Sequence, residues 1–87
     1  MKITFSHHSL EQLSDRGTTQ EEVVETVQNG EQVPAKKGRL AFKKNFPFEN
    51  VWRGRYYPIK QVMPIAVRER DEVIIVTVYV FFFGGEK

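Results

Sequence analysis

The sequence predicts a single α+β domain spanning residues 1–87, in which two N-terminal helices pack on one face of an antiparallel sheet of about four strands. Three observations predict this class. Capped segments with helical periodicity come first, runs of alternating or β-branched residues follow, and the 87 residues contain no repeat and no linker. A chain of this length is sufficient for one modest hydrophobic core.

The helices are predicted mainly by their ends. A short strand over residues 2–5 comes first. Ser6 can cap a helix over residues 7–16, because its hydroxyl accepts a backbone N–H that the first turn leaves unpaired, and Gly17 ends this helix. Each of the two threonines after Gly17 stands three residues before a glutamate, so either can open a capping box. A second helix is therefore predicted to run to about residue 28.

The remainder of the chain has the patterns of an antiparallel sheet. Strands are predicted over residues 39–46, 62–69 and 72–83, while residues 51–57 form either a strand or an extended loop. Pro47 is expected to interrupt the first of these strands, and Arg70-Asp71 to turn the last two into a hairpin. The last strand is apolar on both faces, which predicts that both are covered at least in part. The sheet face away from the helices is left for function or for a partner.

Positive charge is concentrated in the middle of the chain. Residues 1–34 carry a net charge of −4, residues 35–55 a net charge of +6, and residues 56–87 a net charge of 0. The middle block either attracts a polyanion or forms a solvated surface that keeps the protein soluble.

The composition argues against several classes of protein. The chain has no cysteine, which excludes disulfides and thiolate metal sites. Its longest apolar stretch, residues 73–83, is far shorter than the ~20 residues of a membrane helix, and its first residues lack the apolar run of a signal peptide. We therefore expect a cytoplasmic protein with no membrane partner, no cofactor and no metal site.

His8 is the first candidate for chemistry. Leu10 and Leu13 define the buried stripe of the first helix, and at roughly 100° per residue His8 lies nearly opposite that stripe. An accessible histidine can exchange protons near neutral pH, and the alternative is an ordinary surface histidine. His7 and His8 point in different directions, so they are not expected to coordinate one metal ion together.

Four basic residues are candidates for binding RNA. Arg39 and Lys43 share one face of a predicted strand, about 13 Å apart, which could cover two successive phosphates. Arg53 and Arg55 add two cations among aromatic residues, and this mixture suits a single strand whose phosphates meet cations and whose bases stack on rings. The alternative is that the rings are core and the long basic side chains cover them.

Tyr79 shares a face of the last predicted strand with Thr77. On an open face its phenol could donate a proton or bind a phosphate. The alternative is a packed tyrosine whose hydroxyl is hydrogen-bonded.

Three stretches of the chain resemble one known family. They are FSHHSLEQLSDRGT from Phe5 to Thr18, KGRLAF from Lys37 to Phe42, and IVTVY from Ile75 to Tyr79. They are similar to the bacterial family labelled domain of unknown function 4258. This resemblance implies the fold of the RelE-like and barnase-like small ribonucleases.

The resemblance also implies which positions matter. The positions of interest are His8, Arg16, Arg39, Lys43 and Tyr79. The family usually has arginine four residues after the histidine, where this chain has Gln12.

The leading hypothesis is therefore a metal-independent endoribonuclease of toxin type, or a domain derived from one. His8 or Tyr79 would move protons, while Arg16, Arg39 and Lys43 would stabilise negative charge in the transition state. The expected partners are single-stranded or ribosome-associated RNA and an antitoxin protein. The alternatives are a non-catalytic module that binds RNA or protein, which Gln12 favours, and a domain that forms a homodimer through its C-terminal strand.

Overall fold

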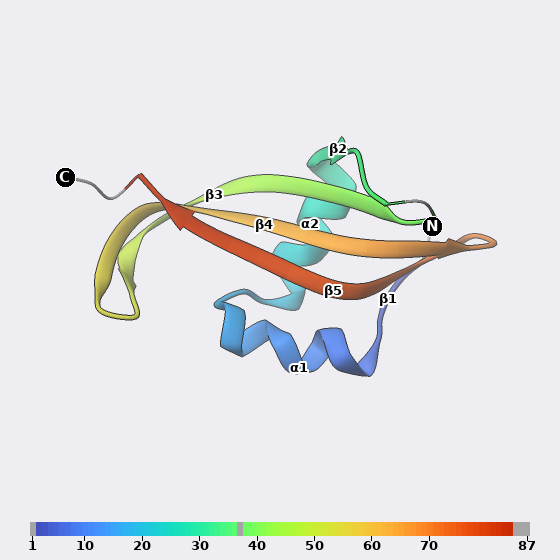
Figure 1. Ribbon diagram of the computed structural model, residues 1–87, viewed down its shortest axis with the longest axis horizontal. Coiled ribbons are helices and arrows are strands. Elements are labelled where there is room, and N and C mark those ends of the chain that lie inside the picture. The colour runs from blue at the N-terminus through green and yellow to red at the C-terminus, as the bar shows by residue number, and fades with distance from the viewer. Residues whose placement is uncertain (1, 37, 85–87) are drawn as a thin grey trace.

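The structure, a computed structural model, describes residues 2–36 and 38–84 (Figure 1). Within them the chain forms two helices and five strands, in the order β1 (Lys2–Phe5), α1 (His7–Arg16), α2 (Gln20–Asn29), β2 (Glu31–Val33), β3 (Leu40–Trp52), β4 (Arg55–Glu69) and β5 (Glu72–Phe83). The predicted α+β class is confirmed. The three long strands give the molecule extents of 45 × 24 × 20 Å.

The sheet is mixed rather than fully antiparallel, and it has five strands rather than about four. Its strand order is β1-β5-β4-β3-β2. The chain passes through both helices and returns so that β1 pairs in parallel with the start of β5, whereas the other three pairings are antiparallel. At the opposite edge, the three-residue β2 pairs only with the segment from Ala41 to Lys43. The predicted strand over residues 2–5 is β1, and the strand that the sequence did not predict is β2, which at three residues is too short to give a periodic signal.

Strand β3 does not stop at Pro47, so the predicted interruption is wrong. Pro47 pairs with Ile59 of β4, and β3 continues to Trp52 after a bulge that follows the proline. In the described residues β2 covers only the first part of β3, so the strand carries a single ladder at Pro47 and a missing N–H there is tolerated.

Both hairpin turns are tight. Trp52 pairs with Arg55 around Arg53 and Gly54, whose φ values of 52° and 84° are those of a type I′ turn. Residues 51–57 are therefore the end of one strand, a turn and the start of the next. The second turn lies at Arg70-Asp71, as predicted.

Helix α1 has the predicted ends. Ser6 accepts a hydrogen bond from the backbone of Ser9, and Gly17 closes the helix with a φ of 79°. The buried stripe differs from the prediction, because Ser9 is fully buried beside Leu13 while Leu10 is 40% exposed. The helix is rotated so that its small residue meets the sheet.

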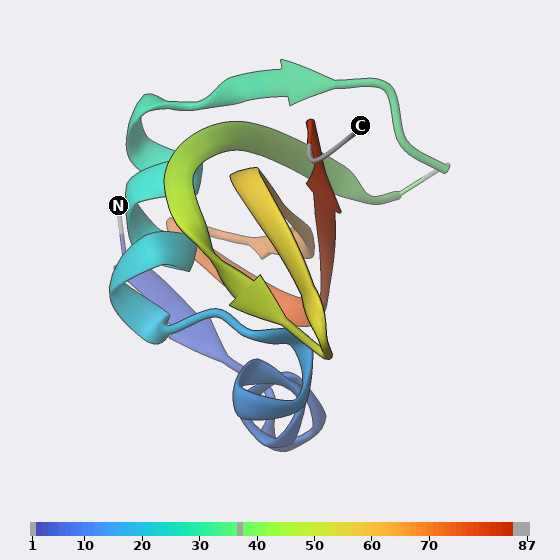
Figure 2. The same ribbon diagram turned by 90° about the vertical axis from the view of Figure 1, so that its left-hand side faces the viewer.

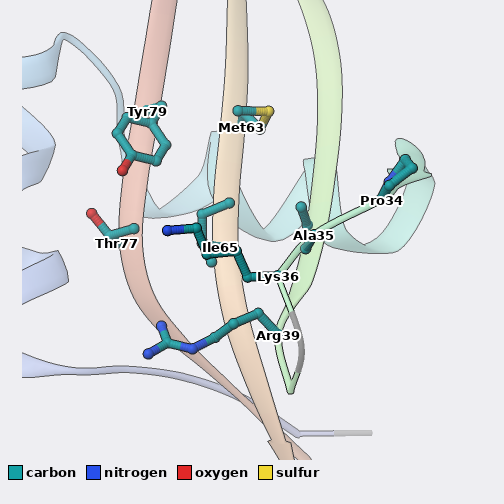
Figure 3. A pocket seen from close by; sticks show the side chains of 9 residues that line it. Pro34, Ala35, Lys36, Arg39, Met63, Ile65, Thr77 and Tyr79 are labelled. Carbon is teal, nitrogen blue, oxygen red and sulfur yellow. The ribbon is translucent and has the colours of Figure 1, made fainter.

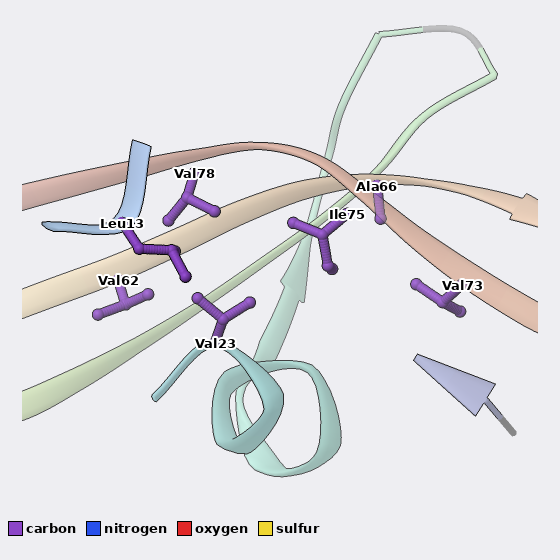
Figure 4. Packing of buried hydrophobic residues seen from close by; sticks show 7 residues of the cluster. All are labelled: Leu13, Val23, Val62, Ala66, Val73, Ile75 and Val78. Carbon is purple, nitrogen blue, oxygen red and sulfur yellow. The ribbon is translucent and has the colours of Figure 1, made fainter. Parts of the chain in front are cut away.

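One hydrophobic core joins the helices to one face of the sheet (Figure 4). Leu13 of α1 and Val23 of α2 meet buried side chains of the long strands. Those strand residues are Val62, Ala66, Val73, Ile75 and Val78. Complete burial of a valine, leucine or isoleucine side chain contributes about 1.5–3 kcal/mol, so this cluster stabilises the packing of the helices on the sheet.

A buried ion pair attaches the segment that connects the two helices to strand β4. The side chain of Lys60 is only 8% exposed, and its Nζ lies 2.8 Å from Glu22 Oε1. The same ammonium donates to the carbonyl oxygen of Gly17 at 2.9 Å, and Thr18 Oγ1 donates to the Glu22 carboxylate at 2.8 Å. The ammonium therefore has both an opposite charge and a second acceptor, as a buried lysine requires.

The other face of the sheet is uncovered in the described part of the chain. In Figure 2 both helices lie to the left and below the sheet, and the opposite side has none. Strand β5 presents Tyr79, Phe81 and Phe83 to this side, where they are 42%, 45% and 38% exposed. This side of the last strand is therefore covered only in part. We call this surface the open face.

Candidate nucleic-acid interface

A turn between β2 and β3 presents two cations side by side. The backbone N–H of Arg39 donates to the carbonyl oxygen of Lys36 at 2.9 Å, which closes a four-residue turn. Gly38 holds the third position of this turn with a φ of 79°, a left-handed conformation that glycine adopts without strain. The turn therefore brings both basic side chains to the same end of the sheet.

These two cations line a pocket of about 750 Å³ on the open face. Figure 3 shows the side chains of Lys36 and Arg39 extending across β4 toward β5, where Thr77 and Tyr79 project. The pocket is lined by Pro34, Ala35, Lys36, Arg39, Ala41, Met63, Ile65, Thr77 and Tyr79. None of these nine residues is acidic, so the pocket has an apolar floor and a positive rim.

Next to the pocket, exposed aromatic rings continue along β5. The rings of Tyr79 and Phe81 have centroids 6.4 Å apart and are inclined by only 19°. A bulge makes this stripe possible: Ile65 pairs with Thr77 while Ala66 pairs with Ile75, so Val76 is an extra residue in β5. The bulge keeps core residues on the helix side and aligns Thr77 with the aromatic stripe on the open face.

Helix α1 lies at the border of the same face, where two of its side chains form hydrogen bonds with the backbone of β5. Gln12 Oε1 accepts the N–H of Val78 at 3.0 Å, and Arg16 Nη1 donates to the carbonyl oxygen of Val78 at 2.9 Å. The two side chains are four residues apart on the helix and so lie on one side of it. They satisfy the peptide groups that a further strand would otherwise pair with.

The structure brings three of the predicted site residues together. Arg39 and Tyr79 line the pocket, and the guanidinium of Arg16 lies 5.6 Å from the centroid of the Tyr79 ring. Figure 3 shows the hydroxyl end of that ring turned toward Thr77. One nitrogen of the Arg16 guanidinium already donates a hydrogen bond to the backbone of β5, so only its other donors remain for a ligand.

Three predicted RNA-binding residues lie elsewhere. Lys43 does not line the pocket, and it stands opposite Glu31 in the β2–β3 register, so a negative charge accompanies it. Arg53 donates to the backbone carbonyl of Asp15 at 2.9 Å and packs over the Trp52 ring, on the helix side of the β3–β4 hairpin. Arg55 is exposed beside the same turn. The predicted basic patch is therefore divided between two ends of the sheet.

His8 is exposed on α1, one turn before Gln12, and it does not line the pocket. The adjacent His7 forms a pair with Glu11 at 3.0 Å on the outer side of the helix. Among the described residues there is no group of three or more His, Asp or Glu side chains that could hold a metal ion. Nor do those residues form a helix long and apolar enough to cross a membrane.

Sequence reasoning missed two contributors to this site. Lys36 enters the sequence analysis only as part of the basic block, because nothing in its loop indicates which way its side chain extends. Gln12 stands in the sequence only as the position where the similar family has arginine, whereas in the structure it accepts hydrogen bonds from both Val78 N and Thr77 Oγ1, which an arginine cannot do.

Comparison with known protein families, with curated proteins and with solved structures found no match.

Proposed function

We propose that the protein binds single-stranded RNA on its open face. The observation that carries this proposal is the pocket, in which two cations extend over an apolar floor toward a stripe of exposed aromatic rings. Cations neutralise phosphates, and aromatic rings stack on bases whatever the sequence. Soluble proteins rarely expose several large apolar side chains next to one another. Where they do, the patch usually marks an interaction site.

A single strand fits this arrangement better than a duplex. A duplex hides the faces of its bases, so exposed rings gain nothing from it, whereas an unpaired strand offers both its bases and its phosphates. The side chains of Lys36 and Arg39 reach across β4 toward Thr77, and the aromatic stripe continues from Tyr79 along β5, so a strand that follows β5 would meet the cations and then the rings.

The test is binding of a fluorescent single-stranded RNA, followed by anisotropy, with two double variants. Lys36→Ala with Arg39→Ala removes both pocket cations and is expected to weaken binding about 25-fold at ~0.1 M salt, from a slope of about 0.7 per neutralised phosphate. Lys2→Ala with Arg68→Ala removes the same charge from exposed positions outside the pocket. Equal losses in both variants would mean that only net charge matters and that the pocket is not the site.

A second candidate function is cleavage of the bound RNA, favoured by the Arg16 guanidinium beside Tyr79 at the edge of the pocket. The resemblance to a family related in fold to RelE-like and barnase-like ribonucleases supports it. In such a reaction the ribose 2′-oxygen forms a bond to the adjacent phosphorus while the bond to the 5′-oxygen breaks. Tyr79 or His8 would transfer the protons, and Arg16 and Arg39 would stabilise the added negative charge.

Cleavage is expected to survive EDTA and to leave a 2′,3′-cyclic phosphate, which mass spectrometry identifies. Tyr79→Phe or His8→Ala should lower the rate about 10²–10⁴-fold if that residue transfers a proton. Tyr56→Phe is the matched control, because Tyr56 is an exposed tyrosine at the β3–β4 hairpin, outside the pocket. RNA that is bound but never cut would leave a binding module. A small protein covering the pocket, as an antitoxin would, should block both activities.

A further inference from the structure

The hydrogen-bond network of Gln12 fixes the direction of the Thr77 hydroxyl. The Val78 N–H can only donate, and it points at Gln12 Oε1 at 3.0 Å, so this atom must be the amide oxygen. Thr77 Oγ1 lies 2.9 Å from the same oxygen. Because that oxygen can only accept, Thr77 must donate its single proton to it. The hydroxyl of Thr77 therefore has only acceptor capacity left for a ligand.

We propose that Thr77 recognises the ribose 2′-hydroxyl and so distinguishes RNA from DNA. This inference rests on the proposed binding of a single strand to the open face. A 2′-hydroxyl can donate to the free lone pairs of Thr77, whereas deoxyribose offers only a C–H at that position. A deoxyribose strand would also leave a half-buried acceptor without its partner.

The neighbours of Thr77 match the parts of one nucleotide. Lys36 and Arg39 line the same pocket and provide a place for the phosphate next to the ribose. Tyr79 is two residues along the same strand face, about 6.6 Å away, and its ring provides a place for the base. The ribose of a nucleotide lies between its base and its phosphate, which puts its 2′-hydroxyl beside Thr77.

Gln12 is a positioning residue in this scheme. Its oxygen accepts from both the Thr77 hydroxyl and the Val78 N–H, while Arg16 donates to the carbonyl oxygen of the same residue, Val78. The acceptor is therefore fixed before a ligand arrives, which lowers the entropic cost of recognition.

A donor could also come from the base, so the probes must separate the two sources. A uridine oligomer and its deoxyuridine counterpart carry identical bases and differ only at the 2′ position. A third oligomer with fluorine at the 2′ position lacks the donor while retaining an electronegative substituent and a ribose-like sugar conformation.

The experiment measures the affinities of the three oligomers by fluorescence anisotropy. Wild-type protein is expected to prefer the ribose oligomer over the other two by roughly 2- to 10-fold, the range of one net hydrogen bond. In Thr77→Val the affinity for the ribose oligomer should fall to the deoxyribose value, while Thr77→Ser should keep the preference.

Three outcomes would overturn the inference while RNA binding stands. A 2′-fluoro oligomer that binds like RNA would show that sugar shape is recognised instead of a donor. A Thr77→Val variant that keeps the preference would exclude this hydroxyl, and equal weakening of the ribose and deoxyribose oligomers would assign Thr77 to the base. The oligomer comparison uses wild-type protein alone, so a ribose oligomer that binds no better than the other two overturns the inference even where a variant is unstable. Absence of any binding to the ribose oligomer would instead refute the proposed function.

Discussion

The salt dependence of RNA binding separates the pocket from the basic block as a whole. The block contains seven cations, whereas among those that the structure describes Lys36 and Arg39 line the pocket. If each neutralises one phosphate, log K should fall with log[salt] with a slope of about −1.4, since single strands give roughly −0.7 per phosphate. Affinity would then drop only about 7-fold between 50 and 200 mM salt. A contribution from Lys43 would raise this to about 18-fold.

Two single substitutions test this reasoning by anisotropy titrations at several salt concentrations. Arg39→Ala should reduce the slope by about 0.7, because one phosphate contact is lost. Arg53→Ala removes an equal charge from the same block, but Arg53 is held on the backbone of Asp15 at the other end of the sheet, so the slope should not change. A slope that responds equally to both substitutions, or to neither, would refute the assignment of the pocket as the phosphate site.

Three further predictions concern the framework that holds the open face. Lys60→Met should lower the free energy of unfolding by about 2–3 kcal/mol and the melting temperature by roughly 10–20 °C, because the partly buried Glu22 loses its counter-charge; adding Glu22→Gln should recover part of the loss in thermal melts followed by circular dichroism. Gln12→Arg should cost about 1–3 kcal/mol in urea denaturation, since arginine cannot accept the Val78 N–H, and unchanged stability would show that this bond is dispensable. Gly17→Ala should cost at least about 1 kcal/mol, because the left-handed φ of 79° strains any other residue and a Cβ would lie 3.0 Å from the Trp52 ring; a neutral effect would contradict that close packing.

Local signals predicted the helices and one hairpin well. Helix α1 begins after Ser6 and ends at Gly17, and both caps form their hydrogen bonds within the helix itself. The sequence around these two residues is therefore enough to predict where the helix begins and ends. The Arg70-Asp71 turn likewise lies between two long strands of unmistakable pattern. In each case the residues that determine the structure are close together in the chain.

Prediction from the sequence fails where contacts between segments far apart in the chain determine the structure. Nothing in residues 2–5 indicates that β1 pairs in parallel with β5, about 70 residues away. Nor does the sequence around Lys60 indicate that this lysine is buried beside Glu22 and the Gly17 carbonyl, which lie about 40 residues away in the chain.

The candidate site was predictable only in part for the same reason. Alternation along a strand placed Tyr79 beside Thr77, and both line the pocket, whereas Arg39 lies in the turn just before β3 and not in the strand predicted to begin there. It could not reveal that Arg53 is occupied by the backbone of Asp15, 38 residues earlier in the chain. Nor could it show that Lys36 reaches across β4, because a loop residue has no periodicity from which its direction can be inferred.

The packing around Trp52 gives the protein its own optical reporter. This is the only tryptophan in the chain, and its indole stacks on Phe82 with centroids 4.9 Å apart and an interplanar angle of 18°. Arg53 covers it, and the end of α1 at Gly17 packs against its edge. The indole lies outside the pocket, so its emission follows the docking of the first helix on the sheet, and separation of the two can be timed without any attached label.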